Sequence, residues 1–169
     1  MPDLHDSVKE TIKKEVLVVL DNLQNWWWHF KQETGIDDEL GMNQYPDTAV
    51  TELFAAPPAG IFIYPDTLTA LSVSLYNSAI IMLCSALVAI EQSRTSSYTE
   101  MSPIPRYHSL IQSHSASVLM AAAYQNWRHP NCGDALRTGF PIHIVSWFGI
   151  SEAHRQEAQR RLEDLGLPA

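Results

Sequence analysis

The chain has 169 residues, of which 46% are hydrophobic and 18% are charged, and its formal net charge is −8. This length and composition are typical of one soluble globular domain. An acidic chain without a basic run is a poor direct binder of nucleic acid, because phosphate contacts depend on Lys and Arg. Two cysteines cannot form a disulfide framework, so we expect a reducing, intracellular location, cytoplasmic or, for a regulator, nuclear.

The first predicted element is an amphipathic helix within residues 1–35. Ser7 and Glu10 have the spacing of a capping box at its start, and Gly35 is expected to end it. Apolar residues recur at three- and four-residue steps between these points, which predicts a helix. Residues 36–66 follow as a proline-rich connector, since proline interrupts helices. Within it we expect a short helix near residues 48–55 and a brief extended piece at residues 61–64.

A long apolar helix is predicted next, capped by Asp66 or Thr67 and running to about Ser93. Its stretch 68–90 carries no charge and is long enough to cross a membrane. Several polar side chains lie within that stretch and no positive cluster flanks it, so we favour a core helix covered by other helices over a membrane span.

Three further helices complete the predicted fold. The first runs from about residue 103 to 127, and the second covers 133–149 with a kink or a fresh start at Pro141. The third begins after the cap Ser151 and ends at Gly166. The sequence therefore predicts one all-α domain over residues 1–169, with about five main helices.

Three segments of the distal half carry a family pattern. The pair Tyr76-Asn77 lies in an apolar helix that continues through 80–84, an Ile-x-small-Ser helix covers 111–118, and a Gly-to-Phe-Pro-Ile segment covers 133–142. In this order, residues 70–167 resemble the C-terminal part of the regulatory (middle homology) domain of fungal zinc-cluster transcription factors. That family reads DNA with a binuclear zinc cluster on six cysteines, which has no counterpart here. The resemblance implies a stand-alone helical piece of such a regulator, with a ligand groove or a partner surface.

Several polar side chains on the predicted helices are candidates for chemistry. His114 lies on an apolar stripe, where it is either a general acid–base group or a core histidine bonded to a backbone carbonyl. His143, one turn before Trp147, has the same two interpretations. Tyr76 and Tyr124 carry hydroxyls that need partners when buried, either across helices or on a ligand carbonyl.

The run Trp26-Trp27-Trp28 cannot direct all three rings into one core, because successive helical residues differ by about 100°. At least one indole should be exposed or should contact a ligand or a partner, unless the helix is buried on most sides. Seven histidines form no HxxxH pair, and no metal site or cofactor motif is predicted. Cys84 lies in an apolar run, where a thiol is unreactive.

These features favour a cofactor-free catalyst for a hydrophobic small molecule. We expect a cyclase or isomerase, of the Diels–Alder type, in fungal secondary metabolism, because such a step needs a shaped pocket and a few hydrogen-bond donors. The alternative is a protein-interaction or ligand-sensing module without its own DNA-binding domain, or a homodimer closed by the apolar face. The expected catalytic residues are His114, Tyr76 and Asn77, and the expected substrate-binding residues are Trp26, Trp27, Tyr124, His143 and Trp147.

Overall fold

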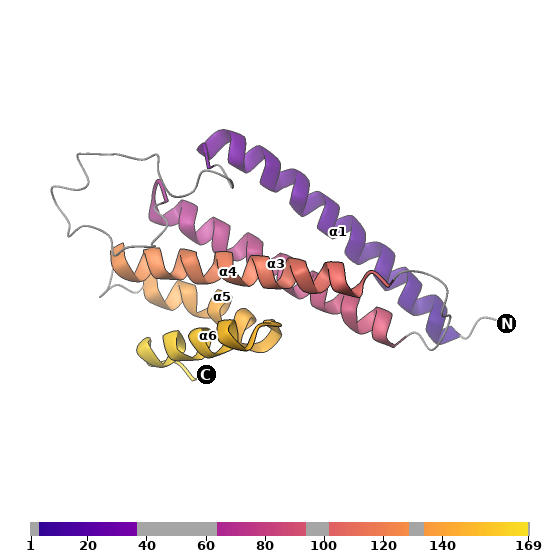
Figure 1. The fold of residues 1–169 in the computed structure, drawn as a ribbon. Helices are drawn as coiled ribbons and strands as arrows, with labels where there is room; N and C mark the ends of the chain where they lie inside the picture. The colour runs from indigo at the N-terminus through magenta and orange to yellow at the C-terminus, as the bar shows by residue number, and fades with distance from the viewer. Residues whose placement is uncertain (1–3, 37–63, 94–101, 129–133, 169) are drawn as a thin grey trace.

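The computed structural model describes residues 4–36, 64–93, 102–128 and 134–168, and every regular element within them is a helix (Figure 1). The helices are α1 (Leu4–Thr34), α3 (Thr67–Gln92), α4 (Ile104–Arg128), α5 (Asp134–Phe148) and α6 (Glu152–Asp164). The prediction of an all-α fold with five main helices is therefore confirmed. The short helix expected near residues 48–55, and residues 61–63 of the expected extended piece, lie outside the described residues.

The central helix of the fold is α3. Its N-terminus is fixed by the predicted cap Asp66, whose carboxylate accepts a hydrogen bond from the Thr69 backbone N–H at 2.6 Å. α1, α4 and α5 all pack against α3, and α6 packs against α5 and α4 (Figure 1). The largest fully buried side chains come from α3, α4, α5 and α6 and form one core, which includes Ile80, Ile81, Leu87, Ile111, Val118, Ile142, Val145 and Leu162.

Among the described helices, α3 is the one whose length and hydropathy would suit a membrane crossing. Core helices of water-soluble proteins share these properties. In this fold, 56% of the most apolar window of α3 is buried by the rest of the chain. Its assignment to a protein core rather than to a membrane stays a prediction.

α1 runs antiparallel to α3 and packs along it. Lys13 near the start of α1 pairs with Glu91 near the end of α3 at 2.5 Å, whereas Trp27 near the end of α1 stacks on Tyr76. Of the described helices, α3 is the one whose backbone lies close to α1. The side chain that α1 buries most deeply against α3 is Leu20.

The predicted start of α1 is wrong, whereas its predicted end is confirmed. The helix begins at Leu4, so Ser7 is an interior residue, and its carbonyl accepts the Thr11 hydroxyl at 3.0 Å. A hydroxyl inside a helix bonds the carbonyl one turn earlier, as this one does. Gly35 follows the last turn with a φ of +69°, a conformation that favours glycine.

α5 and α6 form the lower layer of the fold. α5 continues through the buried Pro141, so no fresh helix starts there. α6 begins at the predicted cap Ser151, whose hydroxyl accepts from the His154 N–H at 3.5 Å. After α6 the chain turns at Gly166, with φ at +68°, and returns to α5, where a Cβ added to Gly139 would lie 2.6 Å from Leu167 Cδ1.

Candidate functional site

A cleft of about 470 Å³ lies between α1, α3 and α4. This volume is within the range of small-molecule sites in proteins. Aromatic and aliphatic side chains make up much of its wall, and the polar side chains include an imidazole and a carboxamide. The cleft is lined by Trp27, Ile36, Tyr64, Val73, Tyr76, Asn77, Ser113, His114, Ala116, Ser117 and Met120.

The polar centre of the cleft is a hydrogen bond between α3 and α4. His114 Nδ1 lies 2.5 Å from Asn77 Oδ1, while Asn77 Nδ2 donates to the Val73 carbonyl at 2.7 Å. The second bond fixes the carboxamide with its oxygen toward the imidazole, and this oxygen can only accept. Nδ1 of His114 therefore carries a hydrogen whether the ring is neutral or charged. In the neutral ring, Nε2 is the basic nitrogen.

The apolar wall of the cleft is built around the Tyr76 ring. One face of this ring stacks on Trp27, with 4.4 Å between the ring centroids and 8° between the planes. His114 approaches Tyr76 edge-on, with 6.0 Å between centroids. The Tyr76 side chain is buried. On the neighbouring Trp27 ring, the ammonium of Lys31 lies 5.9 Å from the ring centre. This aromatic packing holds the wall beside the imidazole in a defined orientation.

Four of the residues expected at the site meet in this cleft, namely Tyr76, Asn77, His114 and Trp27. His114 is half-buried, and at Nδ1 its partner is the Asn77 side chain rather than a backbone carbonyl. Trp26 is 45% exposed, and its ring stacks on Phe30 with 5.0 Å between the centroids. The expectation of at least one exposed indole is confirmed.

The other four expected substrate-binding residues, Trp26, Tyr124, His143 and Trp147, do not line this cleft. Tyr124 is buried behind it, where it contacts the Tyr64 ring edge-on at a centroid distance of 5.3 Å. His143 and Trp147 stack on each other at 5.1 Å on α5, which contributes no residue to the cleft. Trp26 lies on another side of α1, Tyr124 lies on another turn of α4, and His143 and Trp147 lie on α5, so these four residues are outside this cleft. Their expected role in substrate binding stays a prediction.

Burial raises the pKa of three ionisable side chains in the core, two tyrosines and one cysteine. It raises the pKa of the Tyr64 and Tyr124 hydroxyls above their ordinary value, and for Tyr124 the nearby Arg128 opposes the rise. Burial also raises the pKa of the Cys84 thiol to about 11, against the opposing charge of Arg106. Such a thiol is a poor nucleophile near neutral pH, as expected from its apolar surroundings.

Within the described ranges, no group of three or more His, Cys, Asp or Glu side chains is arranged to hold a metal ion.

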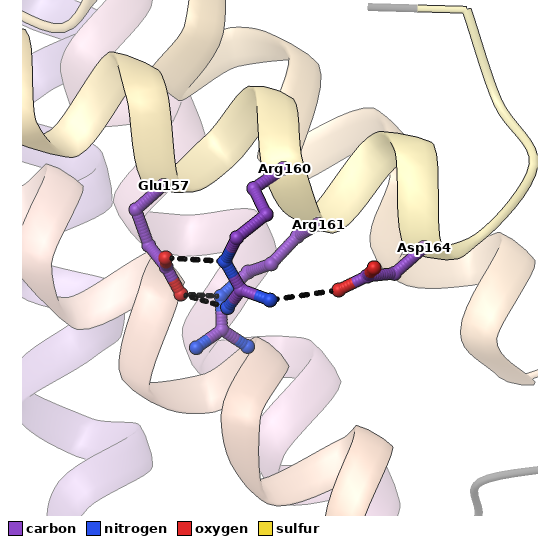
Figure 2. A network of polar contacts seen from close by, with 4 residues as sticks. All are labelled: Glu157, Arg160, Arg161 and Asp164. Atoms are coloured by element: carbon purple, nitrogen blue, oxygen red, sulfur yellow. Dashed lines mark hydrogen bonds and ion pairs between the residues drawn. The ribbon is translucent and has the colours of Figure 1, made fainter.

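A second cleft, of about 290 Å³, lies between α4, α5 and α6 and was not anticipated from the sequence. Its polar wall includes Arg160, Arg161 and Asp164, which form an ion-pair network with Glu157 (Figure 2). The three- and four-residue spacing of these charges on one helix is the sequence signal that could have revealed the ion-pair network.

Several residues of the first cleft, such as Ile36, Tyr64 and Met120, gave no signal in the sequence, because they reach the cleft through tertiary packing alone. The likeness to fungal zinc-cluster regulators rests on the sequence pattern and stays a prediction. No protein-family model, no curated protein and no solved structure matches this chain.

Proposed function

We propose that this protein binds an apolar, carbonyl-bearing small molecule in the cleft between α1, α3 and α4, and catalyses its isomerisation or cyclisation without a cofactor. One observation carries the proposal: the 2.5 Å hydrogen bond that orients the His114 imidazole at a cleft walled by Trp27 and Tyr76. An imidazole whose tautomer and orientation are fixed by a neighbouring acceptor is suited to proton transfer.

For an isomerisation, the step is an internal proton transfer. Nε2 of neutral His114 takes a proton from the carbon next to the substrate carbonyl, and the electron pair moves into the carbonyl to give an enolate. The imidazolium then returns the same proton to a carbon further along the conjugated system, so the double bond moves and nothing else is consumed. Asn77 Oδ1 supports the charged ring, because its partial negative charge faces the Nδ1–H.

For a cyclisation of the Diels–Alder type, the same cleft acts mainly through shape. The stacked Trp27 and Tyr76 rings present a flat apolar wall against which a flexible polyene can fold with its reacting carbons close together. Two carbon–carbon bonds form and no proton is transferred. A charged His114 would polarise a carbonyl on the reacting double bond. The resemblance to fungal regulators would place such a reaction in secondary metabolism.

The proton-transfer form is tested with a polycyclic β,γ-unsaturated ketone, whose conversion to the conjugated enone is followed by ultraviolet absorbance. We expect the protein to accelerate this conversion, and His114→Gln to remove most of the acceleration. His108→Gln is the matched control, because His108 lies on the same helix, is also half-buried and does not line the cleft. Equal rates for the two variants would refute a role for His114 in proton transfer.

Ligand binding is tested separately with the adjacent indoles. Trp27→Leu removes part of the cleft wall, whereas Trp28→Leu removes a neighbouring ring that is 55% exposed and does not line the cleft. We expect Trp27→Leu to weaken binding of the ketone at least tenfold and Trp28→Leu to leave it unchanged. A ketone that binds without any conversion would support a ligand-sensing module instead of an enzyme.

A second function is favoured by a different observation. Val8, Ile12, Val19 and Trp26 are each at least 45% exposed, and their four- and seven-residue spacing places them on one side of α1. Such a row can pack on its own copy across a two-fold axis, which supports a protein-interaction module that forms a homodimer. Sedimentation analysis tests this alternative: Ile12→Lys with Val19→Lys should convert the dimer to a monomer, and a wild-type chain that is monomeric at high concentration would refute it.

A further inference from the structure

We infer that the cleft between α4, α5 and α6 binds a small carboxylate carried on a flat apolar body, with Arg161 as the residue that receives the carboxylate. The cleft has a volume of about 290 Å³ and shares no lining residue with the cleft that contains His114. This inference therefore does not rest on the proposed catalytic function.

All three side-chain nitrogens of Arg160 donate hydrogen bonds within α6. Its Nε and Nη2 donate to the two carboxylate oxygens of Glu157 at 2.9 and 2.8 Å, and its Nη1 donates to Asp164 at 2.9 Å (Figure 2). This two-pronged pairing with Glu157 is the strongest geometry available to a guanidinium. Arg160 consequently pairs with both Glu157 and Asp164, and we do not assign it to the ligand.

Arg161 is engaged on one edge only. Its Nε donates to Glu157 Oε1 at 2.7 Å, and within the described part of the chain Nη1 and Nη2 have no hydrogen-bond partner. Figure 2 shows its two terminal nitrogens pointing away from α6, outside the dashed contacts. The side chain is only 19% exposed, so this donor pair is held in one place at the cleft wall. Two parallel N–H donors match the two oxygens of a carboxylate.

The charges around this donor pair permit an anion. Glu157 and Asp164 balance Arg160 and Arg161, and the hydrogen bond from Arg160 lowers the pKa of Glu157, so the network stays ionised and Arg161 stays oriented. The end of α6 also lies at this cleft, where bare carbonyls would repel an anion. These carbonyls are capped instead: Leu165 N–H donates to the Arg161 carbonyl at 3.1 Å, and Gly166 N–H donates to that of Glu163 at 2.9 Å.

The remaining wall defines the body of the ligand. Trp127 is half-buried and offers an indole, and Ile142 and Leu165 add aliphatic contacts. Asn126 and Thr138 supply polar groups at the same cleft. A single aromatic or alicyclic ring with one carboxylate fits this combination of a flat apolar wall and one forked donor.

Sodium benzoate is the probe, and benzamide is its uncharged counterpart of the same shape. Titrations are followed by two-dimensional ¹H–¹⁵N NMR, with the Trp127 indole N–H assigned from the spectrum of Trp127→Phe. We expect benzoate to shift the Trp127 indole signal in a saturable manner and benzamide to bind at least tenfold more weakly. Added salt should weaken benzoate binding, because the contact is between charges.

The variants then locate the carboxylate. Arg161→Met should weaken benzoate binding at least tenfold, and Arg161→Lys should weaken it less, because lysine keeps the charge without the fork. Arg106→Met is the matched control on α4, since Arg106 is exposed and does not line the cleft, and it should bind benzoate like the wild type. If Arg161→Met does not fold, Arg161→Lys and the comparison of benzoate with benzamide decide alone. Equal binding of the two probes, or binding unaffected by either change at Arg161, would overturn the inference.

Discussion

Replacing Asn77 by alanine isolates the interaction on which the proposed site depends. Asn77 is 4% exposed, and its carboxamide joins α3 to α4 through His114 Nδ1 at 2.5 Å. The substitution leaves the backbone of α3 unstrained, since alanine is the best helix former. Its effect on the free energy of unfolding should therefore report the loss of the hydrogen bonds that the carboxamide makes to His114 and to the Val73 carbonyl, together with the half-buried N–H group of His114 that is left without its acceptor.

The expected magnitude follows from these two contributions. A net hydrogen bond contributes about 0.5–1.5 kcal/mol, and a buried donor without a partner costs about 1–3 kcal/mol. Because His114 is half-buried, water can reach part of the ring, and we expect a loss near the lower end, about 1–2 kcal/mol. In a domain of this size, each kcal/mol lowers the melting temperature by about 2–4 °C.

The measurement is a double-mutant cycle in urea with Asn77→Ala, His114→Ala and the pair. We expect a coupling energy of about 1 kcal/mol between the two side chains. Ser113→Ala, at an exposed neighbour of His114, is the control and should change stability by less than about 0.5 kcal/mol. A coupling energy of zero, or ¹⁵N NMR of neutral His114 that shows the hydrogen on Nε2, would refute the orientation argued from the Asn77 carboxamide.

Four further predictions concern the core, the turn after α6 and the buried thiol. Leu162→Ala should destabilise the fold by about 2–5 kcal/mol in urea unfolding, because Leu162 is 0% exposed in the core, and a loss below about 1 kcal/mol would show that α6 is loosely docked. Gly166→Ala should cost about 1 kcal/mol by the same measurement, because its φ of +68° is unfavourable for a side chain although nothing lies near the added Cβ, and unchanged stability would contradict the turn described after α6. The Cys84 thiol should resist alkylation in a Cys132→Ser background, and rapid labelling would contradict its burial. The pKa of the Cys84 thiol is about 11 in the folded chain and 9.0 in an unfolded one, so the thiol keeps its proton to higher pH when folded. The contribution of Cys84 to stability should therefore fall as the pH rises from 9.0 to about 11. This pH dependence should be absent in Cys84→Ala.

The helices were predictable where local chemistry fixes them. Asp66, Ser151 and Gly35 mark helix ends by short-range hydrogen bonds or by a positive φ, which the neighbouring residues already specify. Ser7 misled the prediction of the first helix start, because a hydroxyl followed by a glutamate has the same pattern inside a helix as at its end. Pro141 was expected to cause a kink or a fresh start, and α5 continues through it without a fresh start.

The site was predictable only in part, because the sequence does not show which turns of different helices lie next to each other. Tyr76 and Asn77 are adjacent on α3, so a single crossing with α4 at His114 brings all three together. Tyr124 lies ten residues after His114, which is about 15 Å further along α4 at 1.5 Å per residue. The periodicity of one helix does not indicate where a second helix crosses it. His143 was therefore expected in the same pocket as His114, although α5 contributes no residue to that cleft.

Trp27 belongs to α1, which among the described helices has the fewest helices close to its backbone. Among the described helices, α3 is the one whose backbone lies close to α1, and elements held by few contacts detach at a lower free energy than the global unfolding of the domain. A molecule seated against Trp27 would add its own binding free energy to the attachment of α1. Ligand binding and the attachment of α1 to the other helices are then coupled. A substitution elsewhere in the α1–α3 contact, at Leu20 for example, would therefore weaken both the ligand affinity and the attachment of α1.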